Sequence, residues 1–118
     1  MKPAAPVDIV AAPEYVGVGT RACRIVSEDG RRAVDRVAVE AGHYFGGDCA
    51  IAQEWRIVEG QGAMTCEGKH FSQQSVRAGD VVHVAKADRV LVHATTLVVI
   101  ELHYAFGKGP DDGPFVQV

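Results

Sequence analysis

The fold is decided by residues 50–94, which read AIAQEWRIVEGQGAMTCEGKHFSQQSVRAGDVVHVAKADRVLVHA. Apolar and polar residues alternate in short runs along this stretch, and many of them are β-branched, which favours strands over helices. Turn residues separate the runs, and Glu67-Gly68 can supply the positive φ that a tight hairpin requires. The stretch therefore predicts short strands joined by turns, at 50–58, 63–66, 70–75, 81–85 and 89–94.

The same pattern continues on both sides of this stretch. It predicts strands at 20–26, 33–39 and 97–106, with a hairpin turn at Asp29-Gly30. Strands at short spacing, with no helical periodicity between them, indicate an all-β sandwich or closed barrel. We predict a single domain with an extended N-terminal arm at 1–19, a barrel at 20–106, and a C-terminal loop and short strand at 107–118.

Composition limits the function classes that remain. The chain has 118 residues, a net charge of -3 and 47% hydrophobic residues, which suits one domain with a buried core. It lacks the basic excess of a nucleic-acid-binding protein and any apolar run long enough for a membrane helix or a signal-peptide core. Three cysteines without a CxxC pair argue against a disulfide scaffold. We expect a cytoplasmic protein that binds neither nucleic acid nor a membrane.

Two blocks of this sequence resemble the cupin superfamily, whose members are small double-sheet, jelly-roll-like β-barrels. The first block, QEWRIVEGQGA at 53–63, ends in a hydrophobic strand and a glycine turn. The second block, GDVVHVA at 79–85, opens with Gly-Asp and is followed by the strand at 89–94. About fifteen residues holding one hairpin separate the blocks, which is also similar to cupins. The resemblance implies a cupin barrel for residues 20–106.

Within the superfamily, the chain looks most like the C-terminal cupin domain of type II phosphomannose isomerases. This likeness rests on residues 53–55 (QEW), 60–63 (GQGA), 99–102 (VIEL) and 109–112 (GPDD). It implies a metal-dependent isomerase that acts on a phosphosugar, which is one alternative for the function.

The ligand positions of metal-binding cupins are substituted in this chain. Most enzymatic cupins hold a divalent metal with two histidines one residue apart, a glutamate and a later histidine, which leaves positions open for substrate. Alignment on the two blocks places Gly47, Cys49, Gln53 and Val90 at those positions, and Ala94 where an asparagine is frequent. Because at most one thiol remains among them, we expect no metal cofactor.

A one-residue shift of the first block would give a different metal site, formed by Asp48, Glu54 and His93. Such a shift turns every side chain of the strand to the opposite face, so Trp55 and Ile57 would point outward. The interior would be poorer in apolar residues as a result. We keep this set as an alternative metal site.

The substituted positions define a candidate ligand pocket. Cys49 and Gln53 would form a small polar patch in an otherwise apolar cavity, with Val90 and Ala94 in its wall. Trp55 would either stack against a ligand or fill the core. Glutamine can donate and accept hydrogen bonds, which suits a hydroxylated or carbonyl ligand. Our leading hypothesis is a metal-free cupin that forms a homodimer and binds a small polar ligand, with carbohydrates as one candidate class. The alternative is a barrel filled by its own side chains.

Three further residues suggest a catalytic alternative. His43 and Tyr44 follow a turn at which many cupins enter the barrel, and His83 lies within the second block. An imidazole can act as a base near neutral pH and a phenol can donate a proton. They would make the protein a metal-independent sugar isomerase or epimerase, with His43 or His83 as base and Tyr44 as acid. The competing interpretation is that they are surface or hydrogen-bonded sheet residues, so the sequence leaves open whether the protein is an enzyme.

Overall fold

The fold is known from a computed structural model that describes residues 8–10, 17–68, 71–106 and 113–116. These residues form strands and turns and contain no helix, so the all-β prediction is confirmed. The strands are β1 (Asp8–Val10), β2 (Thr20–Val26), β3 (Arg32–Val39), β4 (Tyr44–Asp48), β5 (Gln53–Glu59), β6 (Gln61–Glu67), β7 (Phe71–Arg77), β8 (Val81–Val84), β9 (Arg89–Ala94) and β10 (Val98–Ala105).

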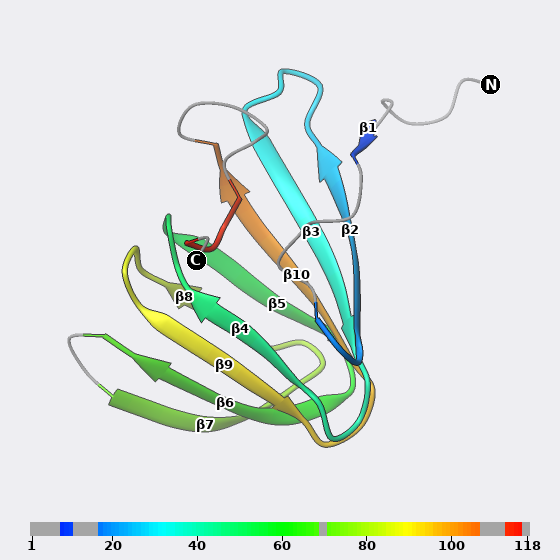
Figure 1. The fold of residues 1–118 in the computed structure, drawn as a ribbon, viewed down its shortest axis with the longest axis vertical. Helices are drawn as coiled ribbons and strands as arrows, with labels where there is room; N and C mark the ends of the chain where they lie inside the picture. The colour runs from blue at the N-terminus through cyan, green and yellow to red at the C-terminus, as the bar shows by residue number, and fades with distance from the viewer. Residues whose placement is uncertain (1–7, 11–16, 69–70, 107–112, 117–118) are drawn as a thin grey trace.

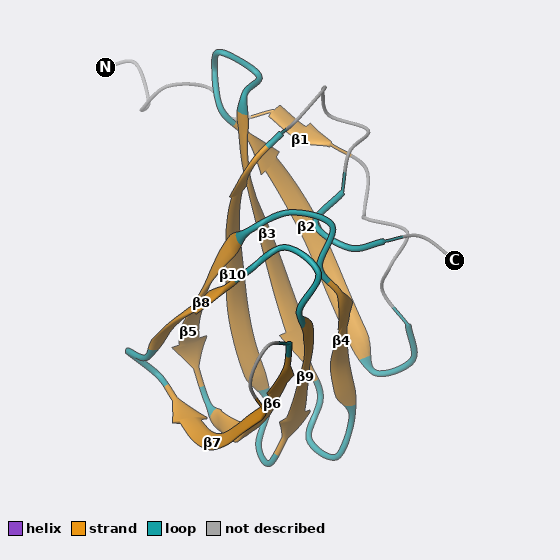
Figure 2. Ribbon diagram, turned by 90° about the vertical axis from the view of Figure 1, so that its left-hand side faces the viewer, coloured by secondary structure: helices purple, strands orange, loops and turns teal. Residues whose placement is uncertain are grey.

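The strands form two antiparallel sheets that face each other (Figures 1 and 2). The larger sheet has the order β1-β2-β3-β10-β5-β8, and the smaller sheet has the order β4-β9-β6-β7. Strands that are distant in sequence are therefore neighbours, and β10 lies between β3 and β5 in the larger sheet. This is the architecture of a double-sheet jelly-roll barrel.

The core lies between the two sheets. Alternate residues of strands such as β3 and β9 point inward, and the intervening residues form the outer faces. Trp55 is fully buried near the centre of this core. The other buried members of the cluster are Ala33, Val37, Val39, Phe45, Cys49, Ile57, Met64, Val76, Val84, Val90, Val92, Ala94, Val98, Ile100, Leu102, Tyr104 and Phe115.

Strand β4 was not predicted, because Gly46-Gly47 within it has the composition of a turn. Gly46 has a φ of +154°, and a side chain at this position would collide with the backbone carbonyl of Val90 on β9. Only glycine fits where the two strands approach so closely. The eight predicted strands each overlap an observed strand, whereas β1 was also missed.

The two ends of the chain are described only in part. Of the predicted N-terminal arm, β1 pairs with β2, and residues 1–7 and 11–16 lie outside the described residues. Of the predicted C-terminal segment, residues 113–116 are described, and Phe115 forms a β-bridge with Cys49. Residues 109–112, which contributed to the isomerase resemblance, are not described. Within the described ranges there is no helix of the length and apolarity needed to span a membrane.

Candidate functional site

The five residues predicted to line a pocket all lie between the sheets. Gln53 and Trp55 come from β5, Val90 and Ala94 from β9, and Cys49 directly follows β4. Gln53 is the most exposed of them, at 5%. The alternation of the strands therefore placed these side chains on the inner face. Cys49 and Gln53 lie at the end of the barrel where β4 ends and β5 begins, which we call the barrel mouth. Ala94 lies at the other end, where β9 finishes beside the start of β4.

Gln53 is the polar centre of the barrel mouth. Its Nε2 donates to the carbonyl oxygen of Pro114 at 2.9 Å and to that of Ile51 at 3.2 Å. Its Oε1 accepts a hydrogen bond of 2.8 Å from the indole Nε1 of Trp55. Both amide hydrogens and the amide oxygen therefore have partners, as a buried amide requires.

Residues 113–116, which we call the strap, cross the barrel mouth (Figure 1, red). The backbone nitrogen of Ala50 donates to the Pro114 carbonyl at 2.9 Å, and that of Val116 donates to the Asp48 carbonyl at 2.8 Å. Pro114 and Phe115 are buried. The strap thus closes the barrel mouth, whereas the sequence indicated only a short strand at the C-terminus.

The Phe115 ring completes an aromatic cluster inside the barrel mouth. It meets the rings of Phe45 and Trp55 edge to face, with centroids 5.6 Å and 6.2 Å away. Phe45 and Trp55 are themselves 5.5 Å apart. Such edge-to-face contacts contribute beyond the burial of apolar area.

A second buried polar cluster lies on the inner face of the larger sheet. Arg24 donates to both carboxylate oxygens of Asp35, at 2.8 Å and 2.9 Å, and the Tyr104 hydroxyl donates to Asp35 at 2.9 Å. Burial, together with the negative charge of Asp35, raises the pKa of Tyr104 above its usual range. A side chain on Gly113 would lie 3.6 Å from the Arg24 guanidinium, so this cluster adjoins the strap.

The residues at the aligned metal-ligand positions do not fit a divalent metal. Gly47 and Val90, which face each other on β4 and β9, have no donor atoms in their side chains. Burial raises the pKa of Cys49 to about 12, and it is the one side chain among these positions with a sulfur donor. The amide of Gln53 is fully engaged. Among the described residues, no group of three or more histidine, cysteine, aspartate or glutamate side chains is arranged to hold a metal ion.

The alternative metal set is not brought together either. Asp48 is exposed and lies 3.2 Å from Arg89, on the outer face of the smaller sheet. His93 is on that same face, stacked on Tyr44 with ring centroids 4.5 Å apart. Glu54 is on the outer face of the larger sheet. The one-residue shift that this set required is therefore wrong.

Of the three candidate acid–base residues, Tyr44 and His83 lie on the outer faces of different sheets. The His43 ring packs against Gly19, and Tyr44 is 58% exposed on the outer face of the smaller sheet. The His83 side chain is 78% exposed on the outer face of the larger sheet, where its Nε2 is 3.7 Å from Glu54. His83 points away from the barrel interior, because β8 turns Val82 and Val84 inward. The structure does not bring His83 and Tyr44 together, and the pairing of His43 with Tyr44 stays a prediction.

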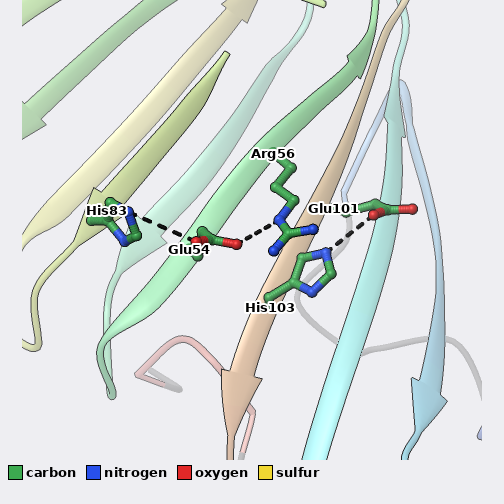
Figure 3. Close-up of polar contacts among 5 residues, drawn as sticks. All are labelled: Glu54, Arg56, His83, Glu101 and His103. Atoms are coloured by element: carbon green, nitrogen blue, oxygen red, sulfur yellow. Dashed lines mark hydrogen bonds and ion pairs between the residues drawn. The ribbon is translucent and has the colours of Figure 1, made fainter. Parts of the chain in front are cut away.

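His83 instead belongs to a row of charged side chains across the outer face of the larger sheet (Figure 3). Arg56 donates to Glu54, and this hydrogen bond lowers the pKa of Glu54. On β10, His103 is 3.1 Å from Glu101. The alternation along β5 and β10 was the signal that could have located this row. Each pair is at least partly exposed to solvent, where such contacts contribute little to stability.

Comparison with known proteins gives a fold but no family. No family model and no curated protein sequence matches the chain. The E162A mutant of Bacillus subtilis oxalate decarboxylase is 18% identical, with a TM-score of 0.68 over 80% of this chain. Salicylate 1,2-dioxygenase from Pseudaminobacter salicylatoxidans is 18% identical, with a TM-score of 0.63 over 77%. The SPY1581 protein of unknown function from Streptococcus pyogenes is 10% identical, with a TM-score of 0.62 over 76% of both chains.

These likenesses concern architecture alone, because sequence identity is low. The chain spans about a quarter of the oxalate decarboxylase and salicylate dioxygenase chains, 28% and 27% respectively. Both of these are cupin-fold proteins, whereas nothing in the comparisons supports the resemblance to phosphomannose isomerases. With its two facing antiparallel sheets and these structural neighbours, the chain has the cupin fold.

Proposed function

We propose that this protein is a metal-independent binding protein that takes a small polar ligand at the barrel mouth. The observation that carries the proposal is the buried amide of Gln53, whose Nε2 donates to the Pro114 carbonyl at 2.9 Å. A hydrogen-bonding side chain inside an apolar barrel is the usual basis of ligand orientation in such sites. When no ligand is bound, the Pro114 carbonyl of the strap accepts the hydrogen bond from Gln53.

Ligand binding requires that the strap and the ligand exchange places. Gln53 Nε2 and the backbone nitrogen of Ala50 both donate to the same Pro114 oxygen, each at 2.9 Å. A ligand oxygen can replace that carbonyl without leaving either buried donor unpaired, which would cost about 1–3 kcal/mol. The donors are neutral and the nearby Arg24 is paired with Asp35, which favours an uncharged hydroxyl or carbonyl group.

The proposal does not extend to catalysis. A metal-independent isomerase with His83 as base and Tyr44 as acid is not supported, because these two residues lie on the outer faces of different sheets. The pair of His43 and Tyr44 would act outside the barrel mouth, since Tyr44 is on an outer face. A metal-dependent isomerase would need imidazole or carboxylate donors where Gln53 and Val90 stand. The homodimer and the cytoplasmic location expected from the sequence stay predictions.

Trp55 provides a direct test, because it is the single tryptophan and its indole donates to Gln53. The protein is titrated with D-mannose, myo-inositol, dihydroxyacetone and a uridine-diphosphate sugar while Trp55 emission and the melting temperature are recorded. We expect a saturable change with at least one compound, and its loss in Gln53→Leu. Gln73→Leu, which alters an exposed glutamine of β7, is the matched control. If no compound changes either signal, the protein binds none of the four compounds. The proposal of a binding site at the barrel mouth is then decided by the aromatic probe described next.

A further inference from the structure

The strap itself indicates what kind of ligand the barrel mouth fits. Two of its chemical groups are buried there: the carbonyl oxygen of Pro114 and the aromatic ring of Phe115. Each group has a defined seat made by residues outside the strap. A molecule that displaces the strap therefore binds most tightly if it fills both seats.

The oxygen seat is formed by two converging donors. Ala50 N and Gln53 Nε2 both lie 2.9 Å from the Pro114 oxygen. Gln53 is held in place by its own bond to Trp55, so its donor is oriented before any ligand arrives. A carbonyl oxygen, which can accept two hydrogen bonds, matches this seat.

The ring seat is formed by Phe45, Trp55 and Gly47. Phe45 and Trp55 present their rings to Phe115 at interplanar angles of 79° and 83°. The Phe115 ring also lies over Gly47, where an added side chain would be 3.4 Å from it. Only a flat ring of about this size uses all three surfaces at once.

The strap is suited to leave these seats. Its described backbone contacts with the barrel body include a single β-bridge, between Phe115 and Cys49, rather than a strand ladder. The adjoining Val116 is exposed, and its nitrogen makes one bond to Asp48. Short segments of this kind open at a lower free-energy cost than the strands of the core.

Building on the proposed function, we infer that the ligand class is an aromatic ring joined by a short linker to an amide or ketone carbonyl, as in an N-acylated phenylalanine derivative. Such a compound occupies both seats in place of Pro114 and Phe115. Since the strap holds the closed state, the apparent affinity of the intact protein is the intrinsic affinity multiplied by the open fraction. Loosening the strap therefore tightens binding.

The test uses N-acetyl-L-phenylalaninamide as the probe and N-acetyl-L-alaninamide as the matched control without a ring. Trp55 emission and the melting temperature are followed in the wild type, in Phe115→Ala and in Val116→Pro. Val116→Pro removes the bond to Asp48 without opening the core, so it serves if Phe115→Ala does not fold. We expect the ring-bearing probe to bind both variants about tenfold more tightly than the wild type, and the control not to bind.

The oxygen seat is tested separately with ethylbenzene, which has the ring but no carbonyl. We expect it to bind Val116→Pro about tenfold more weakly than the ring-bearing amide, because it must displace the strap and then leaves Gln53 and Ala50 without the Pro114 acceptor. Equal binding of the two compounds would overturn the carbonyl requirement.

The remaining outcomes distinguish this inference from the proposed function. A response to one of the sugars or polyols, with none to the ring-bearing amide, would overturn the aromatic ligand class and leave the barrel mouth as a binding site. A silent Trp55 and an unchanged melting temperature with every compound, in the wild type and in a strap variant, would overturn both.

Discussion

Gln53 and Pro114 are 61 residues apart in sequence, and the side-chain Nε2 of the first donates to the carbonyl oxygen of the second at 2.9 Å. This bond joins the start of β5 to the strap across the barrel mouth. The same amide accepts from Trp55, so one side chain couples the strap to the centre of the core.

Replacing Gln53 by leucine should lower the free energy of unfolding by about 1–3 kcal/mol, because the buried Trp55 indole loses its acceptor. Urea unfolding followed by Trp55 emission measures this loss. Gln73→Leu changes an exposed position on β7 and should stay within about 0.5 kcal/mol of the wild type. Equal effects of the two substitutions would mean that the Gln53 network does not stabilise the fold.

Phe115→Ala should lower the free energy of unfolding by about 3–5 kcal/mol, because it leaves a cavity beside Phe45 and Trp55. Phe71→Ala is the matched control, since the Phe71 side chain is on β7 and the residue is 65% exposed. Its effect should be under about 1 kcal/mol. A loss in Phe115→Ala no larger than in Phe71→Ala would contradict the packing of the strap.

Asp35→Asn should cost about 3 kcal/mol or more, since it takes the negative charge away from the buried Arg24 guanidinium. Asp48→Asn removes the same charge from an exposed pair with Arg89 and should cost about 1 kcal/mol or less. Thermal and urea unfolding of both variants compare the two sites. Similar losses would show that burial does not govern the Arg24 pair.

Stability should fall at alkaline pH, in part through Cys49. Burial raises the pKa of its thiol from 9.0 to about 12, so the folded protein keeps a proton that the unfolded chain releases above about pH 9. The contribution of this group is complete below that pH and declines as the pH rises toward 12. In Cys49→Ala this component is absent, whereas Tyr104, whose pKa is also raised, remains in both proteins.

Urea unfolding at about pH 8 and about pH 11 measures the effect. The drop in the free energy of unfolding between the two pH values should be smaller for Cys49→Ala than for the wild type. Parallel drops would show that Cys49 titrates alike in the folded and unfolded chains.

Divalent metal should not bind stoichiometrically at the barrel mouth, because Gly47, Gln53 and Val90 offer no imidazole or carboxylate there. Elemental analysis after exposure to Mn²⁺, Fe²⁺ or Zn²⁺ and extensive dialysis checks this. One ion retained per chain, lost on Gln53→Leu, would contradict the assignment.

Much of the fold could be predicted because alternation is a local property. The strand limits at 20–26 and 89–94 agree with β2 and β9, and the inward orientation of Gln53 and Val90 follows from the same period of two. Strand β4 could not be predicted, since its glycines are required by the close approach of β9, which is a tertiary contact.

The closure of the barrel mouth by the strap could not be predicted from the local sequence either, because it also depends on tertiary contacts. Gly113 and Pro114 have loop composition, and nothing near them in sequence indicates that Phe115 packs against Phe45 and Trp55. The pairing of His83 with Tyr44 fails because the period of two turns each side chain to the outer face of its own sheet.

The position of β10 has a consequence for the timing of folding during synthesis. The ribosome makes β10 after all the other strands, yet this strand lies in the middle of the larger sheet, between β3 and β5. Until it emerges from the exit tunnel, the nascent chain can form hairpins such as β2–β3 and β6–β7 but has no continuous larger sheet. The inner faces of those hairpins stay uncovered in the meantime, so apolar surface is exposed longest during this interval.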